Sequence, residues 1–224
     1  MVSGKANSSS FGRGAGEDSG RERRDTKRAK PPLTEAALRD LALHYVARFA
    51  TTRARLEAYL ARKLKERGVA EDGNGWARQV DVPALVARLV ELGYVDDDAY
   101  ARMRARDLGA RGFGRRRIEQ TLWAAGVDDN LRAAHAPGEA ASRKAAALMA
   151  QKKRLGPWRT PSDCGGDAAG DLVGARKAHE KAVAAMLRAG HQRDHVRFIL
   201  AASREEDVTQ WLDEAADEEE ADRW

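Results

Sequence analysis

Apolar residues recur every three or four positions along most of the chain beyond residue 33, the spacing that gathers them on one face of an α-helix. The first such stripe follows Thr34, a residue type that caps helix N-termini because its hydroxyl accepts a bond from a free backbone N–H. The members of this stripe are Leu38, Leu41, Tyr45 and Phe49. Strict alternation of apolar and polar residues, which would indicate a half-buried strand, is absent from the sequence. The pattern predicts an all-α protein.

Further stripes, each bounded by cap residues or glycine, predict the remaining helices. Leu92, at the end of the third stripe, and Trp123, in the fifth helix, are expected to face the core. Residues 70–80 and 156–171 are predicted to be loops. The predicted helices lie between Thr52 and Gly68, between Asp81 and Gly93, from 96–98 to a break at 111–114, and over 115–125, 128–135, 139–155, 173–189 and 191–202.

Three glycines mark an internal repeat. Gly68, Gly126 and Gly190 lie 58 and 64 residues apart, and each ends the middle helix of a predicted group of three. A period of this length is typical of stacked supersecondary units that bury a shared core. The expected fold is therefore all-α, with about three tandem three-helix repeats that form an elongated, curved body. The predicted bounds of the repeats are 33–93, 94–136 and 137–203.

Charge divides the chain into three segments. Residues 1–32, rich in glycine and serine, carry 8 basic and 4 acidic side chains and are predicted to be a disordered basic segment. Residues 204–224 carry 2 basic and 10 acidic side chains and are expected to be an acidic tail, helical in part. The body between them, 33–203, holds 30 basic against 21 acidic side chains. A basic body favours a polyanionic partner such as nucleic acid.

The residues that catalysis or metal binding would require are missing or isolated. Cys164 is the single cysteine, which excludes an internal disulfide and any multi-cysteine metal site. His191 and His195 stand four apart, but without further ligands nearby we interpret them as solvated side chains at a helix start. The sequence has neither a P-loop motif nor an apolar run of membrane-spanning length. We therefore expect a cytoplasmic protein with no enzyme activity, no cofactor, no metal and no membrane contact.

Two short segments concentrate cations beside an aromatic residue. Residues 102–117, RMRARDLGARGFGRRR, surround Phe113, and residues 151–154, QKKR, precede Trp158. Arginine forks suit phosphate groups and acidic protein surfaces, and an adjacent aromatic ring suits stacking on unpaired bases. For both cationic runs the alternative is a plain solvated helix face, and for the two aromatic residues it is core packing.

Residues 89–127, LVELGYVDDDAYARMRARDLGARGFGRRRIEQTLWAAGV, resemble the signature of the RecX family of recombination regulators. The likeness extends over about 33–202, and the loop at 160–172 and both terminal segments depart from it. It implies the same array of three-helix repeats that the glycine spacing predicts. The matching features are Leu-Gly-Tyr-Val-Asp-Asp at 92–97, Tyr-Ala at 100–101, Arg-Gly-Phe-Gly at 111–114 and a helix that ends in Gly126.

The resemblance implies a regulatory protein that binds the filament of RecA recombinase on single-stranded DNA and inhibits or tunes its activity in recombination, DNA repair and the SOS response. A monomer that works by occupancy is expected. Two alternatives stay open: a helix-turn-helix transcription regulator that reads duplex DNA, and a helical-repeat scaffold that binds no nucleic acid. The predicted electrostatic contact set is Arg104, Arg106, Arg111, Arg115, Arg116, Arg117, Lys152, Lys153 and Arg154.

The acidic tail admits two interpretations. Val208, Trp211 and Leu212 have the spacing of one apolar helical face, with ten carboxylates distributed along the same segment. In the simpler interpretation the tail is a solvated terminal helix that aids solubility. In the other, the tail folds back on the basic body, with Trp211 and Leu212 as anchors, and competes with DNA.

Overall fold

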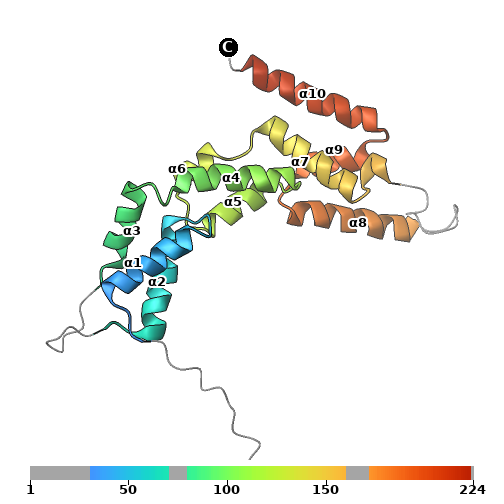
Figure 1. The fold of residues 1–224 in the computed structure, drawn as a ribbon. Coiled ribbons are helices and arrows are strands. Elements are labelled where there is room, and N and C mark those ends of the chain that lie inside the picture. The colour runs from blue at the N-terminus through green and yellow to red at the C-terminus, as the bar shows by residue number, and fades with distance from the viewer. Residues whose placement is uncertain (1–30, 71–79, 160–171, 223–224) are drawn as a thin grey trace, which may run out of the picture. The chain divides into compact units, whose positions relative to one another are not determined.

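The computed structural model describes residues 31–70, 80–159 and 172–222, which form α-helices joined by turns (Figure 1). Within these ranges there is no strand, so the all-α fold class is confirmed, and every helix is too short or too polar to span a bilayer. Most of the predicted disordered segment and loops, with Cys164, lies outside the described residues. The elements are α1 (Glu35–Val46), α2 (Arg53–Arg67), α3 (Val82–Glu91), α4 (Asp97–Ala110), α5 (Arg115–Trp123), α6 (Asp129–Ala134), α7 (Glu139–Lys152), η1 (Gly156–Trp158), α8 (Leu172–Arg188), α9 (Arg193–Ala201) and α10 (Glu205–Ala221).

Five helices begin at polar caps whose side chains bond the first helical turn. The side-chain oxygens of Thr34, Thr52, Asp81, Asp96 and Asp128 each accept a hydrogen bond from the backbone N–H three residues further on. Each bond satisfies an N–H group that the first helical turn cannot pair internally. The caps fix where these helices start, and the starting points decide which apolar residues share a face.

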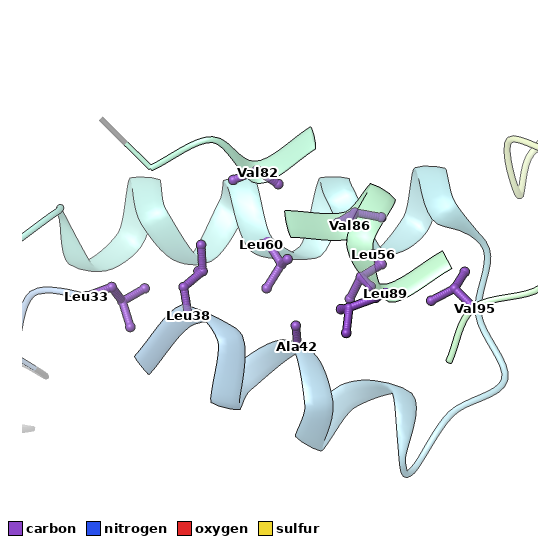
Figure 2. Packing of buried hydrophobic residues seen from close by; sticks show 9 residues of the cluster. All are labelled: Leu33, Leu38, Ala42, Leu56, Leu60, Val82, Val86, Leu89 and Val95. Carbon is purple, nitrogen blue, oxygen red and sulfur yellow. The ribbon is translucent and has the colours of Figure 1, made fainter. Parts of the chain in front are cut away.

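The first three helices enclose an apolar cluster (Figure 2). Leu38 of α1, Leu56 and Leu60 of α2 and Val86 of α3 have no exposed surface. Leu33 is equally buried, because backbone hydrogen bonds hold it beside the end of α2 in an isolated parallel bridge. Burial of each aliphatic side chain of this size contributes about 1.5–3 kcal/mol. The cluster therefore gives this group of helices a core of its own.

Two further clusters follow along the chain. In the group α4–α6, Tyr100, Ile118 and Leu122 are at most 6% exposed. In the group that begins with α7, Met186 of α8 and Ile199 of α9 are fully buried. Helix α10 adds side chains to this last cluster. The core is thus divided into three parts that succeed one another in sequence.

The second and third groups meet through closely packed backbone. The N–H of Gly114, just before α5, donates to the oxygen of Ala189 at 2.9 Å, and the N–H of Arg116 donates to the oxygen of Gly190 at 3.2 Å. A Cβ atom added at Gly114 would overlap the carbonyl group of Gly190. Because these hydrogen bonds fix both backbone segments, only glycine fits at position 114.

We expect Gly114→Ala to lower the free energy of unfolding by about 1–3 kcal/mol, because the added methyl group would force the two backbones apart. Gly109→Ala is the matched control, since Gly109 lies within α4 with open space around its Cα. Alanine at that helix position should raise stability by about 0.5–1 kcal/mol. Urea denaturation followed by circular dichroism measures both variants. Two small effects of the same sign would contradict the close approach.

Three apolar residues on the predicted inward stripes lie at the surface instead. Phe49 is 56% exposed because α1 has already ended, so the helical spacing no longer applies. Leu92 is 53% exposed because it is the C-cap of α3 and not part of its last turn. Trp123 is 66% exposed, although it is helical. The buried stripe of α5 runs through Ile118 and Leu122, and the next residue points about 100° away from it.

Candidate nucleic-acid and protein interface

Neighbouring carboxylates partly neutralise the arginines at the end of α4 and the start of α5. Arg104 and Arg111 share Asp107, each with a nitrogen to oxygen distance of 3.0 Å. Arg115 pairs with Glu119 at 2.8 Å across one turn of α5. Exposed pairs of this kind contribute at most about 1 kcal/mol each. These guanidinium groups are therefore available to a stronger anionic partner.

Helices α4 and α5 also present polar groups to solvent that carry no carboxylate partner among the described residues. Arg106, Arg116 and Arg117 are exposed and form no ion pair with any described residue. The Arg117 guanidinium donates to Oε1 of Gln120 at 3.2 Å. Arg116, Gln120 and Trp123 follow one another at intervals of four and three, so they share one solvent-facing stripe. A cation, an amide and an indole ring on one helix face can contact a phosphate, a base edge and a base plane.

The two basic segments of the sequence meet in space. Lys152, the last residue of α7, donates from Nζ to the backbone oxygen of Arg111 at 3.4 Å. This approach is possible because Gly112 packs directly on the backbone of α7. Lys153 and Arg154 are exposed just beyond the end of the same helix. The predicted contact set therefore lies on α4, on α5 and at the end of α7.

Two further basic side chains belong to this region, although the predicted contact set does not include them. Arg159 and His179 line a hollow together with Lys153 and Arg154. The sequence already shows Arg159 directly after Trp158, just beyond the second basic segment. His179 could not be found in the sequence, because it lies on α8, which only the tertiary fold brings to this place. Trp158 and Phe113 themselves are half-buried and pack on the neighbouring apolar clusters.

His191 and His195 are buried, which corrects the prediction that they are solvated. They are 2% and 4% exposed. Nε2 of His191 donates to the backbone oxygen of Gly112 at 3.1 Å, and Nε2 of His195 donates to Glu139 at 2.9 Å. Partial burial would raise the pKa of Glu139, but the bonds from Arg143 and His195 outweigh it and hold that pKa below its ordinary value. In the described ranges, no cluster of three or more His, Cys, Asp or Glu residues could hold a metal ion.

Stability should depend on pH through His191. Burial holds the pKa of this imidazole below its ordinary 6.5, and His195 adds to the effect, although the bond to the Gly112 oxygen opposes it. The unfolded chain therefore binds the proton more readily than the folded one, and stability should fall as the pH drops below about 6.5. The expected slope is up to about 1.4 kcal/mol per pH unit.

Urea unfolding measured from about pH 7.5 to pH 5.5 tests this prediction. His191→Gln should be less stable throughout, because it loses the imidazole contact, but its stability should no longer fall with pH in this range. The control is His44→Gln, which changes an exposed histidine of α1 and should keep the slope of the unmodified protein. A slope that survives in His191→Gln would assign the pH dependence to other groups.

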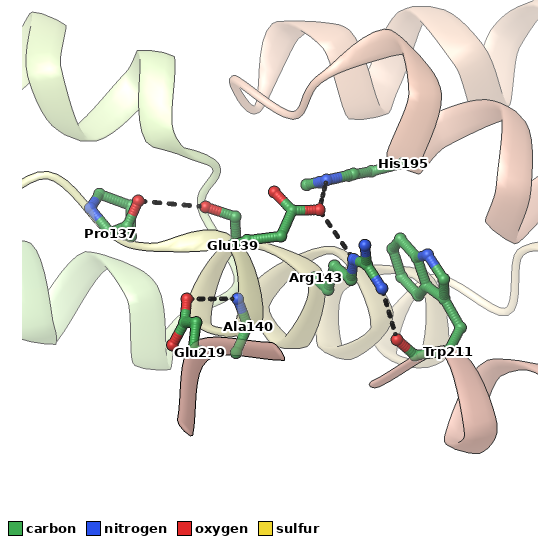
Figure 3. A network of polar contacts seen from close by, with 8 residues as sticks. Pro137, Glu139, Ala140, Arg143, His195, Trp211 and Glu219 are labelled. Carbon is green, nitrogen blue, oxygen red and sulfur yellow. Dashed lines mark hydrogen bonds and ion pairs between the residues drawn. The ribbon is translucent and has the colours of Figure 1, made fainter. Parts of the chain in front are cut away.

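The tail folds back as helix α10 and packs along α7 (Figure 3). Its residues Val208, Trp211 and Ala215 are buried. The Trp211 ring stacks on Phe198 with a centroid distance of 4.5 Å, and the guanidinium carbon of Arg143 lies 4.9 Å from the Trp211 ring centroid. The tail therefore does not stand free in solvent, because Trp211 anchors it to the third core.

Polar bonds strengthen the same contact. Nη1 of Arg143 donates to the backbone oxygen of Trp211 at 2.8 Å, and Oε1 of Glu219 accepts the N–H of Ala140 at 2.9 Å (Figure 3). Glu219 thus binds one of the free N–H groups at the start of α7. None of the nine predicted contact cations forms an ion pair with a described residue of α10. Competition of the tail with DNA stays a prediction.

The chain is similar to proteins of one family along most of its length. The family model for RecX, second three-helix domain, matches residues 96–134, the segment of α4 to α6. The regulatory protein RecX of Myxococcus xanthus (strain DK1622) is 35% identical over 175 residues, which cover 74% of this chain and 88% of that protein. The regulatory protein RecX of Mycobacterium sp. (strain KMS) is 37% identical over 102 residues, 45% of this chain and 51% of that protein. The crystal structure of RecX from Lactobacillus salivarius has the same fold, with a TM-score of 0.52 at 18% identity over 80% of this chain and 96% of that one.

Proposed function

Because the chain belongs to the RecX family of regulatory proteins, we propose that it regulates recombination by binding the RecA filament on single-stranded DNA. It limits the assembly or activity of the filament by occupying it, as a cytoplasmic monomer that catalyses no reaction. The observation that carries this proposal is the family likeness, which extends over most of the chain.

The arrangement of cations supports a polyanionic partner. Of the nine predicted contact residues, Arg106, Arg116, Arg117, Lys152, Lys153 and Arg154 form no ion pair with a described residue. Such groups gain more from an external anion than cations that already have a carboxylate neighbour. In the proposed complex they contact DNA phosphates or acidic side chains of RecA, and Trp123 stacks on an exposed base.

The proposed repeats at 33–93, 94–136 and 137–203 let one chain span several RecA subunits. Three buried clusters, placed in succession along the chain, support this division. Weak contacts that are linked in one chain act together, because the first contact raises the local concentration of the next. A chain bound in this way bridges neighbouring subunits or covers the growing end, and it blocks subunit exchange and strand pairing.

Assembly of RecA on a fluorescent oligo-dT in the presence of ATP tests the regulatory role. We expect the protein to change the rate or extent of assembly at concentrations at which it does not yet bind the naked oligonucleotide. Assembly curves that are identical with and without the protein would contradict the proposal.

Competing nucleic acids separate the proposal from its alternatives. If the protein were a helix-turn-helix regulator, a duplex competitor would displace the fluorescent single strand at a far lower concentration than unlabelled oligo-dT would. A pure protein scaffold would bind its partner with little dependence on salt, since it releases no counterions from DNA. The proposed function predicts preference for the single strand and a strong decrease of affinity with salt.

A further inference from the structure

A basic hollow of about 380 Å³ opens between the end of α7 and helix α8. Lys153, Arg154, Arg159 and His179 line it, together with apolar groups such as Leu200. No acidic side chain is among the described residues that line it. Within the described ranges, the three cationic side chains also form no ion pair elsewhere. The hollow therefore concentrates positive charge that no described residue in its lining neutralises.

Two cations on the helices next to the hollow are paired with carboxylates of their own helix. On α8, Arg176 pairs with Glu180 at 3.0 Å, and on α9, Arg197 pairs with Asp194 at 2.6 Å. In the hollow, by contrast, like charges repel one another across a short distance. An anion placed between them would remove this repulsion and gain an attraction to each cation.

Arg154 occupies a backbone conformation that residues other than glycine avoid. Its φ angle is +53°, and it is the one non-glycine residue with positive φ in the described part of the chain. The N–H of Leu155, the next residue, bonds the oxygen of Ala150 five positions back, which is the closing bond of a Schellman motif. Helices α3, α4, α5 and α8 end with the same bond and have glycine at the position of Arg154, namely Gly93, Gly112, Gly126 and Gly190.

An arginine at this position is strained relative to glycine. The strain is held in place because the turn is fixed from behind: Gly156, also left-handed with φ +56°, packs on the backbone oxygen of Ile199 in α9, where a Cβ would overlap. The cations of the turn thus project from a rigid support, which lowers the entropy cost of binding a ligand. A function of Arg154 in the hollow explains why the strained residue stands where glycine is standard.

We propose that this hollow binds a phosphate group. Arg154 and Arg159 supply forked N–H donors to its oxygens, and Lys153 and His179 complete the site. The proposal rests on the proposed function, in which the phosphate belongs to the backbone of single-stranded DNA. A free nucleotide or inorganic phosphate offers the same chemistry, and the test below separates these sources.

Arg154→Gly tests the proposal sharply, because its two expected effects have opposite signs. The melting temperature should rise by roughly 2–4 °C, since glycine relieves the left-handed strain. Affinity for a fluorescent oligo-dT at low salt should fall about 5- to 10-fold, since one phosphate contact is lost. The slope of log affinity against log salt should also decrease by about 0.7. Arg159→Ala should show the same loss of affinity without the rise in melting temperature.

Lys65→Gln is the charge-matched control, because it removes an exposed cation of α2 far along the chain from the hollow. It should leave affinity within about twofold. If Arg154→Gly and Arg159→Ala lose no more affinity than this control, or if Arg154→Gly melts at a lower temperature, the proposal is overturned. These measurements contain no RecA, so their failure would leave filament binding standing, and a failure of filament regulation would leave a confirmed phosphate site in place.

Competition identifies the source of the phosphate. ATP and inorganic phosphate are each titrated against the complex with oligo-dT, on the unmodified protein and on Arg159→Ala. If ATP displaces the oligonucleotide at micromolar concentrations, and only from the unmodified protein, the site is assigned to a free nucleotide. At high concentration either competitor also weakens binding simply by raising the ionic strength. If neither one displaces the oligonucleotide below that concentration, the hollow is assigned to the DNA backbone.

Discussion

Trp211→Ala should lower the free energy of unfolding by about 3–5 kcal/mol, the usual range when a large buried aromatic side chain is removed. Trp211 is 8% exposed and stacks on Phe198. It also lies edge-on to His195, with ring centroids 5.3 Å apart, and beside the guanidinium of Arg143. Alanine would leave a cavity between α7, α9 and α10 that these neighbours cannot fill. Urea denaturation followed by circular dichroism gives the change directly.

Trp123→Ala is the matched control, since it removes the same side chain from an exposed position. Its effect on stability should be within about 0.5 kcal/mol. If the two variants lost equal stability, the burial of α10 would be contradicted. A loss confined to Trp211→Ala also means that a chain cut before α10 would expose its third core. Truncation is therefore unsuitable as a test of competition between the tail and DNA.

Reversing Arg115, Arg116 and Arg117 to glutamate should weaken binding to the RecA filament by about 10- to 100-fold, at up to about 1 kcal/mol for each lost contact. The fold should survive, because the three exposed side chains form the first turn of α5, where acidic residues interact favourably with the helix dipole. Co-sedimentation with assembled filaments at low salt measures the affinity, and thermal melting checks the fold.

The control reverses three exposed cations elsewhere, Arg39 of α1 and Arg62 and Lys65 of α2. It changes the net charge by the same amount. If binding depends on the α5 surface, this control should lose much less affinity than the α5 variant. Equal losses would mean that only the total charge matters, and unchanged binding of the α5 variant would assign its arginines to a solvated face.

Much of the fold could be predicted because its signals are local. Thr34, Asp81 and Asp96 cap their helices through a bond that spans three residues, so no tertiary information is needed. The buried stripe of α2 through Leu56 and Leu60 follows from spacing alone. The exposure of Trp123 could also have been predicted, because the helical phase of Ile118 and Leu122 already places it outside the buried stripe.

The burial of His191 could not be predicted in the same way. Its partner, the Gly112 oxygen, is 79 residues distant in sequence, and only the packing of two helical groups brings them together. The same holds for Lys152 and Arg111, whose segments were recognised but whose contact was not. The strain at Arg154 stayed hidden for a different reason. The helix was predicted to continue to residue 155, which placed this arginine inside it and not at its closing turn.

The central claim is that the protein binds the RecA–DNA filament in preference to its components. Its affinity for RecA filaments on oligo-dT, for the naked oligonucleotide and for RecA without DNA, each titrated with salt, tests this claim most directly. The account predicts the tightest binding to the filament, at every salt concentration, with an affinity that falls as salt rises. Equal affinity for the filament and for naked single-stranded DNA would contradict it.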